Sequence, residues 1–351
     1  MKLKDSNIHT KIYDVFGIGN ALLDLEYRVE QDFLIKNNIA KGRMSLVNFN
    51  QQQKLRDNLA KSSPNQMHPG GSAANTLFLM SNLGSKIYYH ANLGNDVMGK
   101  HYFHCLNHTG LRTNLTEKTL TPGNTGVCLV MITPDAERTM LTNLGISNQF
   151  HKDHIDIEKI QKAKYVYIEG YIITCDNASE IIKNIIDTAK SSQTKIAITL
   201  SDAILVDNFH DSFHQIINKE NPIDLLFCNK YEACAFAKTN DLSQVKEYLK
   251  NYSKQFVITL GKEGSCIYDG AKFHHINGKK VNAINTLGAG DMYAGAYLHA
   301  ITQGLSAQDA AAFATEASSK IVTKSGPRLS TQEAHNLKEN MPSYKNNTIV
   351  A

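Results

Sequence analysis

The sequence lacks paired cysteines, long basic runs and long apolar runs, and each absence excludes a class of protein. Six cysteines among 351 residues form no C-x-x-C pair, which is typical of reduced thiols in a reducing compartment. Lys and Arg number 37 against 33 Asp and Glu, too small an excess to predict nucleic-acid or membrane binding. No stretch reaches the roughly 18 apolar residues of a spanning helix, and no apolar leader precedes a cleavage site. We therefore expect a cytoplasmic protein without membrane or nucleic-acid partners.

The periodicity of apolar residues favours an α/β fold. Hydrophobic residues make up 42% of the chain, which is ordinary for a globular protein. Short β-branched runs predict strands at Ile12–Ile18, Ile87–Leu93, Gly126–Thr133, Tyr165–Glu169, Ile196–Ser201, Leu225–Asn229, Phe256–Leu260 and Ser265–Asp269. Helical periodicity predicts helices at Asn50–Lys61, Ser72–Leu83, Gly99–Gly110, Ala178–Ser191, Leu242–Tyr252, Gly290–Gly304 and Ser306–Thr323. This alternation predicts a large, mostly parallel sheet covered by helices on both faces, with ligands beyond the carboxyl ends of its strands.

Two stretches interrupt the alternation of strands and helices. Residues 21–50 and about 113–142 show short alternating strands joined by turns, without crossover helices. We interpret them as a small β lid inserted at two points into a large domain. That domain would consist of residues 1–20, 51–112 and 143–351.

The segment NTLGAGDMYAGAYLHA (residues 285–300) carries the strongest indication of chemistry. Gly288, Ala289 and Gly290 precede a helical pattern, so backbone N–H groups at a helix N-terminus can bind phosphate oxygens. Asp291 would lie in the first helical turn, where its carboxylate can accept a proton from an attacking hydroxyl. A carboxylate is a weak base, but phosphoryl transfer depends more on positioning than on proton abstraction. The alternative is that Asp291 only complements the helix dipole.

Two further segments combine glycines with polar side chains. In PGGSAANT (residues 69–76), the glycines permit close approach to a ligand and Asn75 can bind hydroxyls. The alternative is a plain helix start with Ser72 as its N-cap. In DVFGIGNALLDL (residues 14–25), Asn20 and Asp24 follow a strand end and suit a vicinal diol, unless the segment is only a turn.

These motifs, in this order, resemble the ribokinase-like (PfkB-type) family of sugar and nucleoside kinases. The resemblance also includes NKYE (229–232) and TLGKEG (259–264) and extends over almost the whole chain. ERTMLTNLG (137–145) and YIEGY (167–171) are most similar to the adenosine-kinase branch. The resemblance implies a ribokinase-like α/β fold with a small β lid over the acceptor. It also implies ATP- and Mg²⁺-dependent phosphorylation of a primary hydroxyl, most specifically that of adenosine, which yields AMP in purine salvage.

The resemblance also assigns roles to individual residues. Asp291 would be the catalytic base, residues 288–290 the anion hole, and Arg138 a contact to the transferring phosphate. Glu232 would hold Mg²⁺ through water. The ATP site would include Asn229, Thr259, Gly261 and Gly264. The acceptor site would include Asn20, Asp24, Gly70, Gly71, Asn75 and Tyr171, with Tyr171 stacking on a base.

One position departs from the family pattern. Asn285 stands where relatives carry an aspartate that helps to bind an activating monovalent cation. The loss of this charge argues against activation by K⁺ but leaves Asp291 and the anion hole intact.

Several alternatives stay open at this stage. The acceptor could be a sugar, inosine or guanosine, and the chain could instead be a non-catalytic nucleotide-binding regulator or a dehydrogenase. A dinucleotide fingerprint would need a third glycine where Leu22 stands, and the P-loop-like GNDVMGKH (94–101) ends in His101 instead of Ser or Thr. The histidines at 101, 104 and 108 share a helical face but do not by themselves indicate a metal site. Either a monomer or a homodimer fits the sequence.

Overall fold

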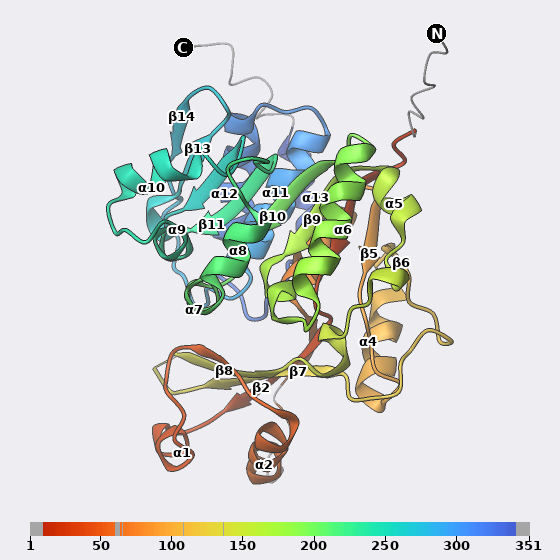
Figure 1. The fold of residues 1–351 in the computed structure, drawn as a ribbon. Helices are drawn as coiled ribbons and strands as arrows, with labels where there is room; N and C mark the ends of the chain where they lie inside the picture. The colour runs from red at the N-terminus through yellow and green to blue at the C-terminus, as the bar shows by residue number, and fades with distance from the viewer. Residues whose placement is uncertain (1–9, 60–63, 65, 108, 136, 342–351) are drawn as a thin grey trace.

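The computed structural model describes residues 10–59, 64, 66–107, 109–135 and 137–341, which form two sheets (Figure 1). The ends of two predicted helices, at 60–61 and at 108, lie outside these residues. The larger sheet has the strand order β14-β13-β12-β11-β10-β9-β1-β5-β6. Its strands are β1 (Tyr13–Ile18), β5 (Ile87–His90), β6 (Arg112–Thr113), β9 (Ala163–Glu169), β10 (Lys195–Thr199), β11 (Leu225–Asn229), β12 (Phe256–Thr259), β13 (Ser265–Tyr268) and β14 (Phe273–Ile276).

Helices cover both faces of this sheet because successive strand residues point to opposite sides. In β1, Val15 joins the apolar core on one face, whereas Phe16 and Ile18 join the core on the other. The first face is covered by α3 (Ser72–Asn82), α4 (Val97–Asn107), α11 (Ala289–Thr302), α12 (Ala307–Ile321) and α13 (Thr331–Glu339). The second is covered by α5 (Ile157–Gln161), α6 (Ala178–Ser191), α7 (Ala203–Asn208), α8 (His210–Ile216), α9 (Lys230–Ala237) and α10 (Leu242–Leu249). The predicted α/β ribokinase-like architecture is confirmed.

The sheet is parallel except at one edge. β13 pairs antiparallel with both β12 and β14, although the sequence beyond Tyr165 predicted parallel strands. Only residues 260–264 separate β12 from β13, and so short a connection cannot make the crossover that parallel strands need. No described helix is long and apolar enough to span a membrane.

The second sheet has the strand order β3-β8-β7-β2-β4. Its strands are β2 (Leu22–Arg28), β3 (Met44–Leu46), β4 (Gln66–Gly70), β7 (Gly126–Ile132) and β8 (Arg138–Asn143). Two helices, α1 (Gln31–Lys36) and α2 (Phe49–Leu59), lie on the side that faces away from the larger sheet (Figure 1). α2 corresponds to the helix predicted at Asn50–Lys61, whereas α1 stands where the sequence predicted only a turn between strands, and that part of the prediction was wrong. β4 also shows that the sheet takes strands from outside 21–50 and 113–142. The division into two domains stays a prediction.

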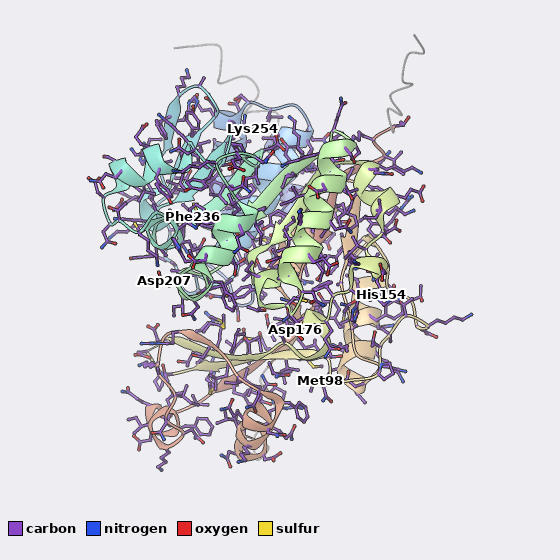
Figure 2. The ribbon with its side chains drawn as sticks, viewed as in Figure 1. Met98, His154, Asp176, Asp207, Phe236 and Lys254 are labelled. Atoms are coloured by element: carbon purple, nitrogen blue, oxygen red, sulfur yellow. The ribbon has the colours of Figure 1, made fainter. Side chains whose placement is uncertain are left out.

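The two parts of the molecule share apolar contacts at α4. Met98 packs against the core of the larger sheet and also against the core of the second sheet, and Figure 2 labels it beside β7. Just before it, the carboxylate of Asp96 accepts hydrogen bonds from the Gly99 amide (2.7 Å) and the Thr125 hydroxyl (2.6 Å). The P-loop-like segment therefore forms a turn that fixes the start of α4 beside the start of β7.

Helices α3 and α11 pack against each other at a glycine. A Cβ atom on Gly295 of α11 would lie 2.6 Å from the carbonyl oxygen of Thr76 in α3, so no larger residue fits without movement. This close approach sets the distance between the N-termini of the two helices.

We expect Gly295→Ala to destabilise the fold and to impair the site at the N-termini of α3 and α11. Overpacking costs about 1–3 kcal/mol, and the helices must separate to relieve it. Thermal unfolding measures the loss. Gly290→Ala in the same helix is the control, because a Cβ there meets nothing within 4 Å. Equal melting temperatures for the two variants would contradict the packing argument.

Candidate active site

Asp291 occupies the first turn of α11, where two side chains of α3 bind its carboxylate. The Ser72 hydroxyl donates to Oδ1 (2.6 Å), and the Asn75 amide donates from Nδ2 to Oδ2 (2.9 Å). Ser72 was predicted as a possible N-cap, but Gly71 takes that position and leaves the hydroxyl free to bind Asp291. Burial raises the pKa of Asp291, while these two hydrogen bonds and the charge of Arg328 lower it. The carboxylate is thus held in one orientation.

Glycines allow both helices to begin where they do. Gly71 (φ 95°) and Gly288 (φ 75°) adopt left-handed backbone conformations as N-caps of α3 and α11. A Cβ on Gly71 would lie 2.0 Å from the Asn20 carbonyl oxygen, and one on Gly288 would lie 2.2 Å from that of Pro327. Gly290, by contrast, faces open space. The Ala289 amide donates to the Thr286 carbonyl (3.2 Å), but no hydrogen bond from another described residue occupies the Gly290 amide. The Gly290 amide is therefore free to meet a ligand, as an anion hole requires.

Two cavities adjoin at this helix N-terminus. The first cavity, of about 680 Å³, contains most of the predicted acceptor site and both ends of the 229–232 motif: Asn20, Asp24, Gly71, Asn75, Arg138, Tyr171, Asn229, Glu232, Gly288 and Asp291. The second cavity, of about 900 Å³, contains the predicted ATP loop: Thr259, Gly261, Gly264 and Ala289. Ala283, Thr286 and Gly290 line both. Gly70 lines neither, but a Cβ on Gly70 would lie 2.4 Å from the Asp24 carboxylate, so the glycine makes room for that side chain. Asn229 and Thr259 are partners in the register of β11 and β12, but Asn229 lines the first cavity and Thr259 the second.

The first cavity is strongly acidic. Among the described residues, six carboxylate side chains line it, against the single arginine Arg138: Asp24, Glu137, Glu169, Asp202, Glu232 and Asp291. Burial raises the pKa of Asp24 to about 7, with a smaller rise from the charges of Glu26 and Asp291 that Arg328 opposes. Burial likewise raises the pKa values of Glu169 and Glu232 to about 7. The empty cavity therefore favours neutral or cationic groups over anions.

Asn229 and Glu232 hold each other at the start of α9. The Asn229 side chain accepts from the Glu232 amide (2.9 Å), while the Glu232 carboxylate accepts from the Asn229 backbone (3.0 Å) and side chain (2.5 Å). This capping box fixes a carboxylate at the rim of the first cavity. Among the described residues, no cluster of three or more acidic, His or Cys side chains could enclose a metal. A Mg²⁺ ion that keeps its waters, and binds through them to one carboxylate, fits this arrangement.

Arg138 lies at the start of β8, between the first cavity and a smaller one of about 230 Å³. Its Nε is buried and makes no hydrogen bond. A buried guanidinium N–H without an acceptor is costly, so this group is prepared for an anionic ligand.

Asn285 lies next to the anion hole and is buried. Its Nδ2 donates to the Gly326 carbonyl (3.3 Å) and its Oδ1 accepts from the Leu287 amide (2.8 Å). An aspartate could not make the first of these bonds, since it has no donor when ionised. The amide therefore supports the loop that leads into α11. The expectation about K⁺ stays a prediction.

Two residues of the site escaped the sequence analysis. Glu169, at the end of β9, accepts from the Ala73 amide (2.8 Å) and from the Asn20 side chain (3.4 Å), and so joins two glycine-rich motifs. Its place within YIEGY, after a buried strand, was the available signal. Arg328 contacts Asn75 from 253 positions away, and nothing in its local sequence indicates this.

Comparison with known proteins identifies the family. The model of the pfkB family carbohydrate kinases matches residues 38–334, and the chain belongs to this family, which confirms the resemblance found in the sequence. Adenosine kinase 1 of Arabidopsis thaliana is 24% identical over 335 residues, covering 89% of this chain and 94% of that protein. 5-Dehydro-2-deoxygluconokinase of Clostridium beijerinckii is 24% identical over 304 residues, covering 82% and 85%. The crystal structure of adenosine kinase from Sinorhizobium meliloti superimposes with a TM-score of 0.85 at 28% identity, covering 92% of this chain and 98% of that one.

We expect Asp24→Asn to stabilise the ligand-free protein at pH 8 but not near pH 4. The pKa of Asp24 is about 7 in the fold against an ordinary 3.8, so the folded state binds its proton more tightly than the unfolded state does. Stability from this group is therefore present below pH 4 and is lost as the pH rises to about 7. Thermal unfolding across this range measures the difference, on the order of 4 kcal/mol at pH 8. The exposed Asp187→Asn is the control, and a variant no more stable than the natural protein at pH 8 would contradict the argument.

Proposed function

We propose that this pfkB-family protein is an adenosine kinase, which transfers the γ-phosphate of ATP to the 5′-hydroxyl of adenosine and yields AMP and ADP. The observation that carries the proposal is the division of the first cavity into a polar and an apolar part. Asn20, Asp24, Asn75 and Asp291 supply the polar part. The apolar part includes Met44, Leu46, Met140 and Leu144, with Tyr171 from the short 3-10 helix after β9.

The register of the second sheet separates these parts. Asp24, Cys128 and Thr142 are cross-strand neighbours on β2, β7 and β8. This row therefore begins with a carboxylate on β2 and ends on β8, the strand that carries Met140. β2 and β8 are two strands apart, which is about 10 Å. A ribose gripped by Asp24 and Asn75 would therefore place its base against the methionines and leucines. A bare sugar would leave that apolar surface uncovered.

The catalytic roles follow from the position of Asp291. Its carboxylate follows the Gly290 amide at the start of α11, so a hydroxyl bound there can lose its proton to Asp291 as it attacks phosphorus. The amides of residues 288–290 would bind the transferring phosphate, and Arg138 would reach it from the second sheet. The nucleotide would occupy the second cavity, where Gly261 and Gly264 approach its phosphates and Tyr293 lies among apolar side chains.

Kinases of this family use ATP with Mg²⁺. Glu232 and Asn229 would hold the ion through water, and its charge neutralises the phosphate oxygens when bound. We also propose that the second sheet acts as a lid that excludes water from the first cavity. Cytoplasmic location and a monomeric or homodimeric state remain part of the proposal.

The main alternative is a sugar kinase, since one relative is named for a sugar acid. Six carboxylates against one arginine make the first cavity unfavourable for an anionic acceptor of that kind. Inosine and guanosine are nucleosides as well, so this argument does not distinguish them from adenosine. A non-catalytic regulator would have no use for a carboxylate held by Ser72 and Asn75.

The proposal predicts strong ADP release from Mg-ATP with adenosine, and weak release with inosine, guanosine, ribose, fructose or fructose 6-phosphate. Asp291→Ala should lower kcat by roughly 100- to 10,000-fold, because the base is removed while the second cavity is untouched. Coupled detection of ADP in parallel wells measures both effects, with the exposed Asp187→Ala as control. Preference for a bare sugar, or normal turnover of Asp291→Ala, would reject the assignment. If no acceptor causes ADP release although the protein still binds ATP, the result would favour a non-catalytic regulator.

A second prediction concerns K⁺. Because Asn285 already donates to the Gly326 carbonyl, replacing K⁺ by tetramethylammonium should leave kcat unchanged. Steady-state assays at constant ionic strength test this. A marked loss of turnover without K⁺ would show that a cation binds despite the missing carboxylate.

A further inference from the structure

Arg328 lies behind the catalytic carboxylate and touches it through one intermediate side chain. Its Nε donates to Oδ1 of Asn75 (2.7 Å), and Nδ2 of Asn75 donates to Oδ2 of Asp291 (2.9 Å). An amide side chain can turn over, and the flipped form would place its oxygen against the Asp291 carboxylate. A donor that binds only the oxygen selects the orientation in which the NH₂ group faces Asp291.

Arg328 is itself held firmly. Its guanidinium lies over the ring of Phe78, 4.9 Å from the centroid, and also hydrogen-bonds the hydroxyl of Tyr102. That hydroxyl donates to the Gly70 carbonyl (3.0 Å) just before α3. The guanidinium is therefore fixed relative to α3, the helix that carries Asn75.

The two residues before Arg328 also support the site. The Gly326 carbonyl accepts from Asn285, and the Pro327 carbonyl packs against Gly288 so closely that no Cβ would fit. The segment 326–328 thus contacts the loop before α11, the N-cap of α11 and the amide that binds Asp291. One short segment after α12 reaches three parts of the same site.

The positive charge of Arg328 also acts on the acidic groups of the site. The charged groups that face Asp291 from β2, β9 and α9 are Asp24, Glu169 and Glu232, and all three are acidic. Arg328 lowers the pKa of Asp291 and that of Asp24 against the effect of burial. Without it, Asp291 would face these three carboxylates, with Arg138 as the remaining cation among the described residues that line the first cavity.

We propose that Arg328 is a positioning residue that turns the Asn75 amide toward Asp291 and so keeps the base aligned with the acceptor hydroxyl. This inference rests on the proposed function, because it takes Asp291 as the base. It adds a residue that touches neither substrate.

The test compares Arg328→Met and Arg328→Lys with the natural protein, using whichever acceptor the panel shows to be phosphorylated. Arg328→Met should lower kcat about 100-fold, because a displacement of about 1 Å costs that much, while KM for ATP stays unchanged. The acidic limb of its pH–rate profile should move to higher pH, since the pKa of Asp291 rises. Arg328→Lys should restore part of kcat and should return the acidic limb most of the way to its position in the natural protein. Arg112→Met is the matched control, because that guanidinium lies over the ring of Tyr13, away from the site.

A double-mutant cycle isolates the route through Asn75. Adding Arg328→Met to Asn75→Ala should lower kcat little further, and the melting-temperature shifts of the single variants should sum to more than that of the double variant. Additive effects, or a lower melting temperature with normal kcat and an unmoved pH limb, would overturn the proposal. The thermal cycle needs no turnover, so it decides the Arg328–Asn75 coupling even if every acceptor fails and the proposed function falls.

Discussion

The close contact between α3 and α11 at Gly295 is the constraint on which the candidate active site depends. Asp291 and its two hydrogen-bond donors come from different helices, 216 and 219 positions apart in the chain. A single methyl group at Gly295 would press on the backbone of α3 and separate these groups. A packing requirement in the core is therefore also a requirement on catalytic geometry. Stability and activity should respond together to changes at this contact.

The first cavity contains buried carboxyl groups whose negative charges no neighbouring cation fully balances. Asp24, Glu169 and Glu232 are almost fully buried, and burial raises the pKa of each to about 7. Such groups destabilise an empty protein at neutral pH. Ribose hydroxyls and a hydrated Mg²⁺ ion are the ligands that would relieve this cost. The same arrangement discourages anionic acceptors, so it contributes to specificity as well as to binding.

The sequence located most of the site because its glycine motifs are local. Gly71, Gly288 and Asp291 lie within a few residues of their helix starts, so spacing alone indicated a ligand-binding helix N-terminus. The covered sheet followed from alternating strands and helices. The roles that the family resemblance assigns to these residues stay predictions.

The rest was hidden from the sequence for identifiable physical reasons. Arg328 and Glu169 act through contacts across the chain, which no periodicity records. The helix α1 has six residues, too few for a helical pattern to stand out among strands. The antiparallel edge at β13 was signalled by a short connection, but the regular alternation before it favoured parallel pairing. Asn229 lines the same cavity as Asp291 because of the order of the strands in the larger sheet, which the order of the motifs along the chain does not reveal.

The meeting of two cavities at Gly290 has a stereochemical consequence for the proposed reaction. Donor and acceptor would approach the amides of α11 from separate chambers that share only Ala283, Thr286 and Gly290. Phosphorus would then pass directly between them in one displacement, with the attacking and leaving oxygens in line. No side chain would carry the phosphoryl group in between. A γ-phosphate made chiral with oxygen isotopes would therefore reach the product with inverted configuration.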